Sequence, residues 1–122
     1  FGREVQRRIL AGTAVLSSDR FHSHYEGAAS VRGTICKELK AAFDENSGID
    51  LMIIPTAVTN PPTLGLSMQP DSTEAFKNDV MTVPISLAGL PSISIPVFLA
   101  KEEHPVVGMQ IFGPRLSENK VL

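Results

Sequence analysis

The feature that most constrains the fold is a short, nearly continuous apolar run from Ile49 to Ile54, which ends at Pro55. A run of this length that stops at a turn residue is typical of a strand buried on both faces. Such a strand needs neighbouring strands beside it and a covering layer on each face of its sheet. We therefore expect a layered structure in which helices cover a sheet.

Two further segments in the second half of the chain predict strands. Residues 92–97 alternate serine with larger apolar residues, and residues 106–112 are mostly apolar. The polar segment 100–105 between them is expected to form a hairpin loop. The proline-rich segment 55–72 carries few charges and is expected to be a long loop, a kind of segment that is often functional in compact proteins.

The first half of the chain has a helical pattern. The apolar face of its first helix follows the 3.6-residue period and consists of Val5, Ile9, Gly12, Thr13 and Leu16. Residues 17–19 break this pattern and offer an N-cap to a second helix, expected over 19–45 and ended by Asn46-Ser47-Gly48. The buried stripe of the second helix is expected to contain Phe21, Tyr25, Ala28, Ile35, Leu39, Ala42 and Phe43.

A short helix is expected over residues 73–81, with Ser72 or Thr73 as its cap, between the first predicted strand and the other two. Helices followed by strands, with a helix between strands, indicate the α/β class. The chain begins at Phe1 rather than Met and ends in what resembles the first turn of a helix, so we expect a fragment. Because most of the sheet is expected outside it, the fragment should expose large apolar faces.

The composition is that of a folded segment, with 43% hydrophobic and 20% charged residues among 122. The formal net charge of −2 does not favour a nucleic-acid surface, although a partner could provide one. Cys36 is the single cysteine, which excludes an internal disulfide. The sequence contains no run of 18 apolar residues, so no membrane span is predicted.

Two arginines stand out as candidate functional or structural charges. On a helical wheel Arg8 lies about 60° from Val5, at the edge of the apolar stripe, where a guanidinium could reach a pocket and bind a carboxylate. From the wheel alone, the favoured interpretation of Arg8 is a structural one, a half-buried pair with an Asp or Glu. Arg32 falls within the apolar stripe of the second helix, where a buried structural ion pair is the favoured interpretation.

The second half of the chain carries one candidate carboxylate and two strand serines. Asp79 could hold a substrate ammonium group, and the pattern alone favours a solvated carboxylate. In the stretch 87–91 (Leu-Ala-Gly-Leu-Pro), small residues permit close backbone approach and the proline fixes the entry into the next strand. Ser92 and Ser94 should share one face of that strand, where a serine without a neighbouring base is normally structural.

Several kinds of site are not supported by the residues present. His22 and His24 are two positions apart and therefore lie on different helix faces, His104 lies in a predicted loop, and no metal site is expected. No glycine-rich phosphate loop and no Gly-x-Ser-x-Gly elbow is present. No catalytic residue is therefore assigned within this chain.

The sequence nevertheless resembles the A subunits of glutamyl-tRNA(Gln) amidotransferases, a branch of the amidase-signature family. The resemblance rests on residues 1–9 (FGREVQRRI), 12–13 (GT), 16–18 (LSS), 25, 29, 31–32, 50–56, 78–84 (NDVMTVP), 87–91 (LAGLP), 94–96 (SIP) and 107–113 (VGMQIFG). It covers nearly the whole chain, although residues 57–75 and 99–105 depart from the usual pattern. The last block recurs across the wider family and is less specific than the first ones.

The resemblance implies a fold and a reaction. The fold is an α/β/α sandwich around a mixed sheet, in which residues 1–122 form the C-terminal part of a single domain. The reaction uses a Ser–cis-Ser–Lys triad to hydrolyse glutamine, with backbone N–H groups stabilising the oxyanion. The Gly-Ser-Ser-Gly-Gly-Ser stretch and the lysine block of that triad are absent from this chain, so the fragment is expected to be inactive.

The resemblance also implies partners and a substrate site. The ammonia would pass to the B subunit of the amidotransferase, which uses ATP and Mg²⁺ to amidate Glu-tRNA(Gln), within a complex that also contains the C subunit and binds tRNA. Arg8 matches the family's residue for the glutamine α-carboxylate, and Asp79 matches the residue for its α-amino group. The compartment would be the cytoplasm in a bacterium, or the mitochondrion or plastid in a eukaryote.

Two other functions remain open from the sequence. A stand-alone amidase acting on a small amide would share the fold, but a neutral amide would give neither Arg8 nor Asp79 a charged partner. A non-catalytic interaction domain would also fit a chain without a catalytic serine, provided that the parent lacks the Gly-Ser-Ser stretch as well. The pair Arg8 and Asp79 therefore discriminates between these functions.

Overall fold

A computed structural model describes residues 1–60, 65, 73–99 and 106–122. The chain forms two compact units, Phe1–Lys37 and Glu38–Leu122, which we call unit 1 and unit 2. The long loop expected over 55–72 and the hairpin loop expected over 100–105 fall largely or wholly outside the described residues, as does Ser72.

Unit 1 begins with helix α1, Arg3–Val15, with Gly2 at its N-cap position. The helix ends with the Leu16 amide donating to the Gly12 carbonyl at 3.0 Å. Ser17 then breaks the helical pattern, as predicted, and its hydroxyl donates back to the carbonyl of Ala14 at 2.7 Å. Among the described residues Ser17 makes no side-chain cap bond to the following helix, so the predicted capping role is carried by its backbone alone.

The second helical segment contains three consecutive elements: α2 (Ser18–Arg20), a π-helical stretch η1 (Phe21–Glu26) and α3 (Gly27–Ala42). Within η1 the rings of Phe21 and Tyr25 stack with centroids 5.0 Å apart. This continuity confirms the expected long helix, while the wider π turn was not predicted. Periodicity at 3.6 residues cannot identify a single π turn because one inserted residue merely shifts the apolar face.

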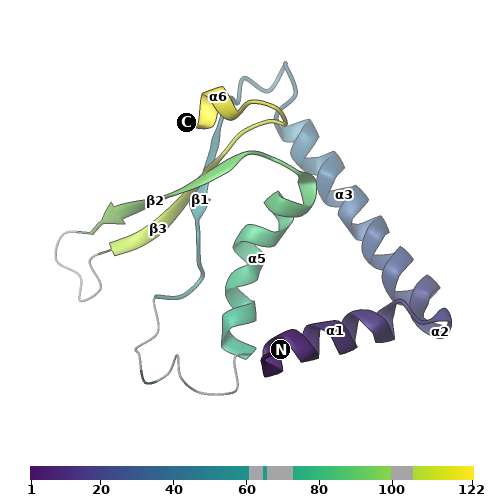
Figure 1. Cartoon of the computed structure of the whole chain (residues 1–122). Coiled ribbons are helices and arrows are strands. Elements are labelled where there is room, and N and C mark those ends of the chain that lie inside the picture. The colour runs from purple at the N-terminus through teal and green to yellow at the C-terminus, as the bar shows by residue number, and fades with distance from the viewer. Residues whose placement is uncertain (61–64, 66–72, 100–105) are drawn as a thin grey trace. The chain divides into compact units, whose positions relative to one another are not determined.

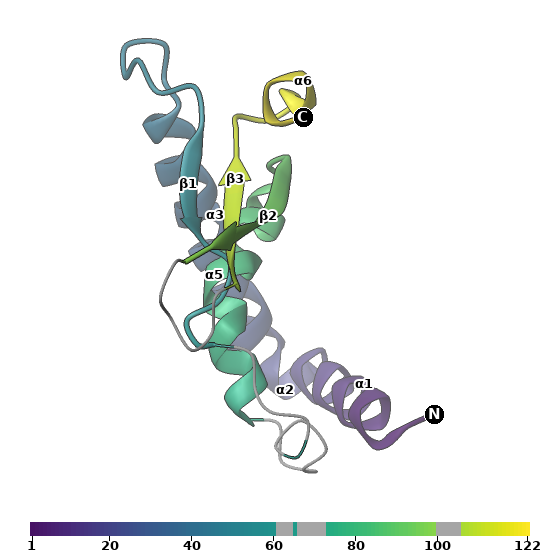
Figure 2. The ribbon, with the colours of Figure 1, turned by 90° about the vertical axis from the view of Figure 1, so that its left-hand side faces the viewer.

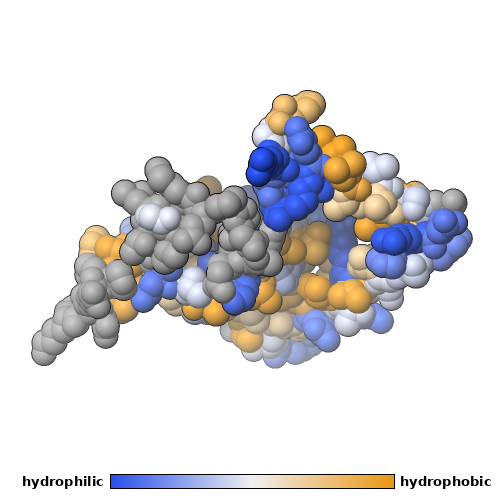
Figure 3. Space-filling model, turned by 90° about the horizontal axis from the view of Figure 1, so that it is seen from below, coloured by the Kyte–Doolittle hydropathy of each residue, from blue (hydrophilic) through white to orange (hydrophobic). Residues whose placement is uncertain are grey.

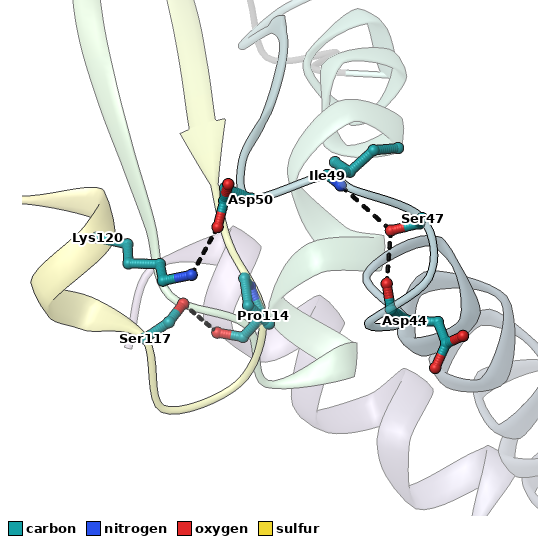
Figure 4. A network of polar contacts seen from close by, with 7 residues as sticks. All are labelled: Asp44, Ser47, Ile49, Asp50, Pro114, Ser117 and Lys120. Carbon is teal, nitrogen blue, oxygen red and sulfur yellow. Dashed lines mark hydrogen bonds and ion pairs between the residues drawn. The ribbon is translucent and has the colours of Figure 1, made fainter.

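The long helical segment ends at Ala42, three residues before the expected position 45. The Phe43 and Asp44 amides bond to carbonyls three residues earlier, which tightens the last turn. The Ser47 amide donates to the Asp44 carbonyl at 2.8 Å, and the Ser47 hydroxyl donates to the same carbonyl at 2.7 Å, the bond drawn in Figure 4. Gly48 follows with φ +66°, a left-handed conformation suited to the glycine that ends this turn.

Unit 2 contains a three-stranded antiparallel sheet in the order β1-β3-β2 (Figures 1 and 2). The strands are β1 (Met52–Pro55), β2 (Ser92–Phe98) and β3 (Val106–Phe112). Residues at positions 54, 110 and 94 lie opposite one another across the sheet, which sets the register. The two later strands confirm the sequence prediction to within one residue.

The expectation that β1 is buried on both faces is wrong for this chain. Ile53 is 61% exposed, and the burial of the strand alternates along its length. The physical reason is position, because β1 lies at an edge of the described sheet and pairs with β3 alone. Edge strands also tolerate proline, which explains why Pro55 ends β1 as a paired residue opposite Met109 and why Pro96 fits within β2.

Helix α5, Thr73–Ala88, is longer than the expected helix over 73–81. It continues through Pro84 and ends where Gly89 adopts φ +67°, with the Leu90 amide donating to the Ile85 carbonyl. A left-handed glycine after the last turn, followed closely by proline, is a strong helix stop. Within the described part of the chain, no heavy atom lies within 4 Å of the position that a Gly89 Cβ would occupy, so conformation rather than the predicted close approach requires this glycine.

The last element, α6 (Glu118–Val121), confirms the helical turn expected at the end of the sequence. The Lys120 ammonium lies 2.6 Å from Oδ1 of Asp50, just before β1 (Figure 4). The hydrogen bond from Lys120 and its positive charge hold the pKa of the Asp50 carboxyl below its ordinary value. A Cβ on Gly113 would lie 2.8 Å from the Ser117 hydroxyl, so this turn has no room for a side chain.

The apolar core of unit 2 is small. Ile85 and Phe112 are each 3% exposed, and the Phe43 ring meets the Phe112 ring edge-on with centroids 6.0 Å apart. Large apolar side chains reach the surface in both units, and Figure 3 shows several on the face that it draws. This confirms the expected exposure of apolar surface. Those exposed to 40% or more include Val5, Ile9, Leu16, Tyr25, Val31, Ile49, Ile53, Val80 and Leu87.

The architecture is that of the predicted α/β class, with helices and a sheet in unit 2. The predicted stripe of the second helix is only partly covered. Its later members, Ile35, Leu39, Ala42 and Phe43, are half-buried, whereas Tyr25 and Ala28 are exposed. The two strand pairs described here are both antiparallel.

Candidate functional site

Arg8 lies on α1 with 67% of its side chain exposed. Its Nε atom donates to Oε1 of Glu4 at 3.0 Å, and Oε2 of the same carboxylate lies 2.8 Å from Nη2 of Arg7. Positions i and i+4 of a helix are neighbours, so this pair follows directly from the sequence spacing. The Arg8 guanidinium is therefore accessible to a ligand and is oriented by a neighbour on its own helix.

The buried position expected for Arg32 is wrong, because the residue is exposed on α3. The prediction assumed that the stripe of the second helix is covered along its whole length. Val31, next to it, is also exposed at 60%, which shows that this part of the helix surface is uncovered in unit 1.

Asp79 lies in unit 2, in the first half of α5, and is exposed. The favoured interpretation from the pattern, a solvated carboxylate, agrees with this exposure. An accessible carboxylate on a helix surface can also receive an ammonium group from a ligand. Arg8 and Asp79 belong to different units, and each is fixed within its own unit.

Asn78, the residue before Asp79, links α5 to the segment that follows β1. Its Oδ1 atom accepts from the backbone amides of Val58 and Thr59 at 2.9 and 3.2 Å. The Thr59 hydroxyl lies 3.3 Å from the same oxygen and 3.1 Å from the Asn78 Nδ2 atom. Sequence reasoning missed this arrangement, whose one signal was the position of Asn78 within the Asn-Asp block.

A groove with a volume of about 530 Å³ lies between the segment after β1 and the first half of β3. Asn78 lies along it, so the linked segment forms part of its wall. The residues that line the groove are Pro55, Ala57, Val58, Thr59, Asn60, Asn78, Val106, Val107, Gly108 and Met109.

The hydroxyl of the residue that follows β1 and a hydroxyl of β2 meet across β3. The Thr56 and Ser94 hydroxyls lie 2.8 Å apart, and a Cβ on Gly108 would come within 3.1 Å of Thr56. Ser92 and Ser94 share an exposed face of β2, as predicted. Gln110 beside Ser94 is 5% exposed, and its buried Oε1 atom has no hydrogen-bond partner in the described part of the chain. This cluster contains no base that could activate a serine.

The histidines of η1 make local contacts. The Nδ1 atom of His22 lies 3.0 Å from Oε2 of Glu26, and that of His24 lies 2.8 Å from the Ser23 hydroxyl. Within residues 1–60, 65, 73–99 and 106–122, no three side chains of His, Cys, Asp or Glu are grouped as a metal site would require.

The full length of the chain matches one protein family. Residues 1–122 fit the family described as Amidase. The chain belongs to the amidase family. This membership accounts for the blocks that the sequence shares with the amidase-signature pattern, from the first helix to the last strand.

Curated relatives of this amidase-family chain carry a more specific name. The A subunit of glutamyl-tRNA(Gln) amidotransferase from Wolbachia pipientis wMel is 42% identical over 122 residues, and that from Zymomonas mobilis subsp. mobilis is 41% identical over the same length. Both alignments cover 100% of this chain and 24% of the relative. The chain therefore spans about a quarter of the length of these relatives.

Solved structures give the same family and support the α/β fold. The A subunit of glutamyl-tRNA(Gln) amidotransferase from Thermotoga maritima superposes with a TM-score of 0.70 at 34% identity, covering 99% of this chain and 25% of that one. A crystal structure described as an amidase gives a TM-score of 0.70 at 31% identity, covering 99% of this chain and 26% of that one. Within the described residues, no helix combines the length and apolarity needed to cross a bilayer.

Proposed function

We propose that this amidase-family chain belongs to the glutamine-hydrolysing component of a tRNA-dependent amidotransferase. The observation that carries the proposal is its 42% identity to the A subunit of a glutamyl-tRNA(Gln) amidotransferase across all 122 residues, which include every block quoted for the resemblance. Because the chain spans 24% of that relative, the reaction is proposed for the full-length protein rather than for the chain alone.

In this proposal Arg8 and Asp79 bind the two charged groups of free glutamine. The guanidinium of Arg8 binds the α-carboxylate, since its planar fork can donate two parallel hydrogen bonds. The carboxylate of Asp79 accepts from the α-ammonium group. The exposure of both residues supports this role, because a substrate-binding charge must be accessible when the substrate is absent.

Glu4 supports the orientation of Arg8. Its carboxylate engages Nε at 3.0 Å, which restricts the rotamers of a long side chain before the substrate arrives. Ordering a rotamer-rich side chain on binding costs about 0.5–1.5 kcal/mol, so a preoriented guanidinium binds its carboxylate more tightly.

The bond-breaking chemistry lies outside these residues. A Ser–cis-Ser–Lys triad elsewhere in the full-length protein attacks the side-chain amide of glutamine, releasing ammonia and forming an acyl enzyme that water hydrolyses to glutamate. The ammonia passes to the B subunit, where ATP and Mg²⁺ support amidation of Glu-tRNA(Gln), and the C subunit completes the complex. The present chain by itself is inactive in this scheme.

The experiment that tests the proposal pairs substrate analogues with variants of the full-length protein. Glutaminamide lacks the α-carboxylate, and N-acetylglutamine lacks the α-ammonium charge. The wild type should hydrolyse glutamine with the lowest KM. Arg8→Ala should raise the KM for glutamine but not for glutaminamide, and Asp79→Asn should raise it for glutamine but not for N-acetylglutamine.

The alternative of a stand-alone amidase is favoured by one observation, the solved structure described as an amidase at a TM-score of 0.70. It predicts a different result in the same experiment. A neutral amide without α-substituents would be hydrolysed as well as glutamine, and neither variant would change the discrimination among the four substrates. That result would replace the proposed glutaminase.

A further inference from the structure

The carboxamide of Asn78 makes hydrogen bonds to residues 19 and 20 positions away in the chain. Its Oδ1 atom accepts from the Val58 amide at 2.9 Å and from the Thr59 amide at 3.2 Å. Its Nδ2 atom donates to the Thr59 hydroxyl at 3.1 Å. One side chain of α5 thus satisfies two consecutive backbone donors and one hydroxyl of the segment after β1.

These donors occur where the chain leaves the sheet. The Thr56 amide still donates to the Gly108 carbonyl at 2.8 Å, continuing the pairing of β1 with β3. Two residues later the Val58 amide bonds to Asn78 instead. Backbone amides that leave a ladder need another partner or water. Asn78 provides that partner and ties this segment to α5.

Asp79 follows Asn78 on the same helix, about 100° further around its axis. The bonds from Asn78 to Val58 and Thr59 therefore fix the rotation of α5 about its axis, and its position along that axis, where it carries the Asp79 carboxylate. We propose that Asn78 is a positioning residue that sets the Asp79 carboxylate for the ammonium group of the substrate. This inference rests on the proposed function.

The test uses the full-length protein and three substitutions. Asn78→Ala removes the bonds of the Asn78 carboxamide to Val58 and Thr59, and Thr59→Val keeps the backbone bond of residue 59 but removes its hydroxyl. Asn46→Ala is the matched control, because Asn46 bonds to Asp44 at 3.1 Å in an exposed turn. Steady-state kinetics give KM and kcat for glutamine, and hydrogen exchange reports the amides of Val58 and Thr59.

Asn78→Ala should raise the KM for glutamine about tenfold, and Thr59→Val about threefold, from the usual net contribution of such hydrogen bonds. Asn46→Ala should leave KM unchanged. Amidation with ammonia as the nitrogen donor should keep its rate in all three variants. Exchange at Val58 and Thr59 should accelerate in Asn78→Ala, and an unchanged KM for glutamine in that variant would overturn the inference.

Kinetics with N-acetylglutamine distinguish a positioning role of Asn78 from a merely structural one, because this substrate lacks the ammonium group that Asp79 is proposed to bind. Asn78→Ala should leave its KM unchanged. An equal rise for both substrates would show a general disturbance of the fold and overturn the inference, and Thr59→Val provides the same comparison with a smaller disturbance.

Asp79→Asn distinguishes the failure of this inference from that of the proposed function. If Asp79→Asn raises the KM for glutamine while Asn78→Ala does not, the inference alone is wrong. If Asp79→Asn leaves glutamine hydrolysis unchanged, the proposed function is wrong, and the role of Asn78 toward this substrate is overturned with it.

Discussion

The Nε atom of Arg8 lies 3.0 Å from Oε1 of Glu4, one helical turn earlier on α1. Because the same carboxylate also contacts Arg7, Glu4 is shared between two cations. Exposed ion pairs of this kind contribute little to stability, typically about 0.2–1 kcal/mol. We therefore expect the ion pairs of Glu4 to orient the Arg8 side chain and to add little to the stability of the fold.

Replacement of Arg8 should impair the reaction that uses glutamine as the nitrogen donor and spare the reaction that uses ammonia. In the full-length protein Arg8→Ala should raise the KM for glutamine by roughly tenfold or more, since a hydrogen bond to a charged group contributes about 1.5–3 kcal/mol. Amidation with ammonia should continue at the wild-type rate. The KM of Arg8→Lys for glutamine should lie between those of the wild type and Arg8→Ala, because lysine keeps the positive charge but lacks the planar guanidinium that donates two parallel hydrogen bonds. Arg3→Ala is the control, and an equal loss with both donors would contradict the assignment.

Glu4→Gln should have a much smaller effect than Arg8→Ala. The substitution keeps the size of the side chain and a hydrogen-bond acceptor but removes the charge that pairs with Arg8 and Arg7. A change of about 0.2–1 kcal/mol corresponds to a KM for glutamine raised less than about fivefold. Glutamine saturation curves check this, and a loss as large as that of Arg8→Ala would mean that Glu4 itself contacts the substrate.

The two later strands were the most predictable part of the fold, whereas β1 (Met52–Pro55) begins three residues after the expected start at Ile49. Alternation along residues 92–97 matches the pleat, and residues 106–112 form a paired central strand. The end of α5 was predicted wrongly because the sequence offers two competing signals. Pro84 suggests an early stop, whereas Gly89 with Pro91 marks the actual one. A left-handed glycine determines the end, while one proline removes a single hydrogen bond.

Tertiary position explains what the sequence could not predict. The exposure of Ile53 depends on β1 being an edge strand, which strand patterning does not encode. The contact of Asn78 with Val58 spans 20 positions and follows from no local period. Periodicity also left Arg8 and Asp79 open between structural and functional roles, and only the resemblance assigned them to glutamine. The structure adds their exposure and their immediate neighbours.

The contact between Asp50 and Lys120 should make stability depend on pH at the acid end. The pKa of Asp50 is lowered in the folded protein, so folding favours the ionised carboxylate. The contribution is therefore fully present above the unfolded pKa of about 4 and is lost as the pH falls through the lower folded value. The carboxyl is exposed, so the effect should be small and should weaken with salt.

Lys120→Met provides the matched measurement for this ion pair. The substitution removes the ammonium group and keeps an unbranched side chain of similar length. Titration of the Asp50 carboxyl by NMR should give a pKa that rises toward the ordinary aspartate value. Acid unfolding of the variant should also lose the part of its pH dependence that belongs to Asp50. An unshifted pKa would show that the contact does not persist in solution.

Gly89 and Gly113 are each required for a different reason, the first for its backbone conformation and the second for lack of space. Gly89 has φ +67°, and no atom of the residues that the structure describes lies within 4 Å of its Cβ position, whereas a Cβ on Gly113 would come within 2.8 Å of the Ser117 hydroxyl. Gly89→Ala should destabilise the protein by about 1–2 kcal/mol, the cost of a left-handed conformation, and Gly89→Asn should cost less. Gly113→Ala should be relieved only in part by Ser117→Ala, which removes the hydroxyl at 2.8 Å but leaves Leu51 Cδ2 and Val121 Cγ2 at 3.0 and 3.2 Å from the new methyl. Denaturant unfolding measures each change, and a Gly89→Ala variant as stable as wild type would mean that the end of α5 can adopt another conformation.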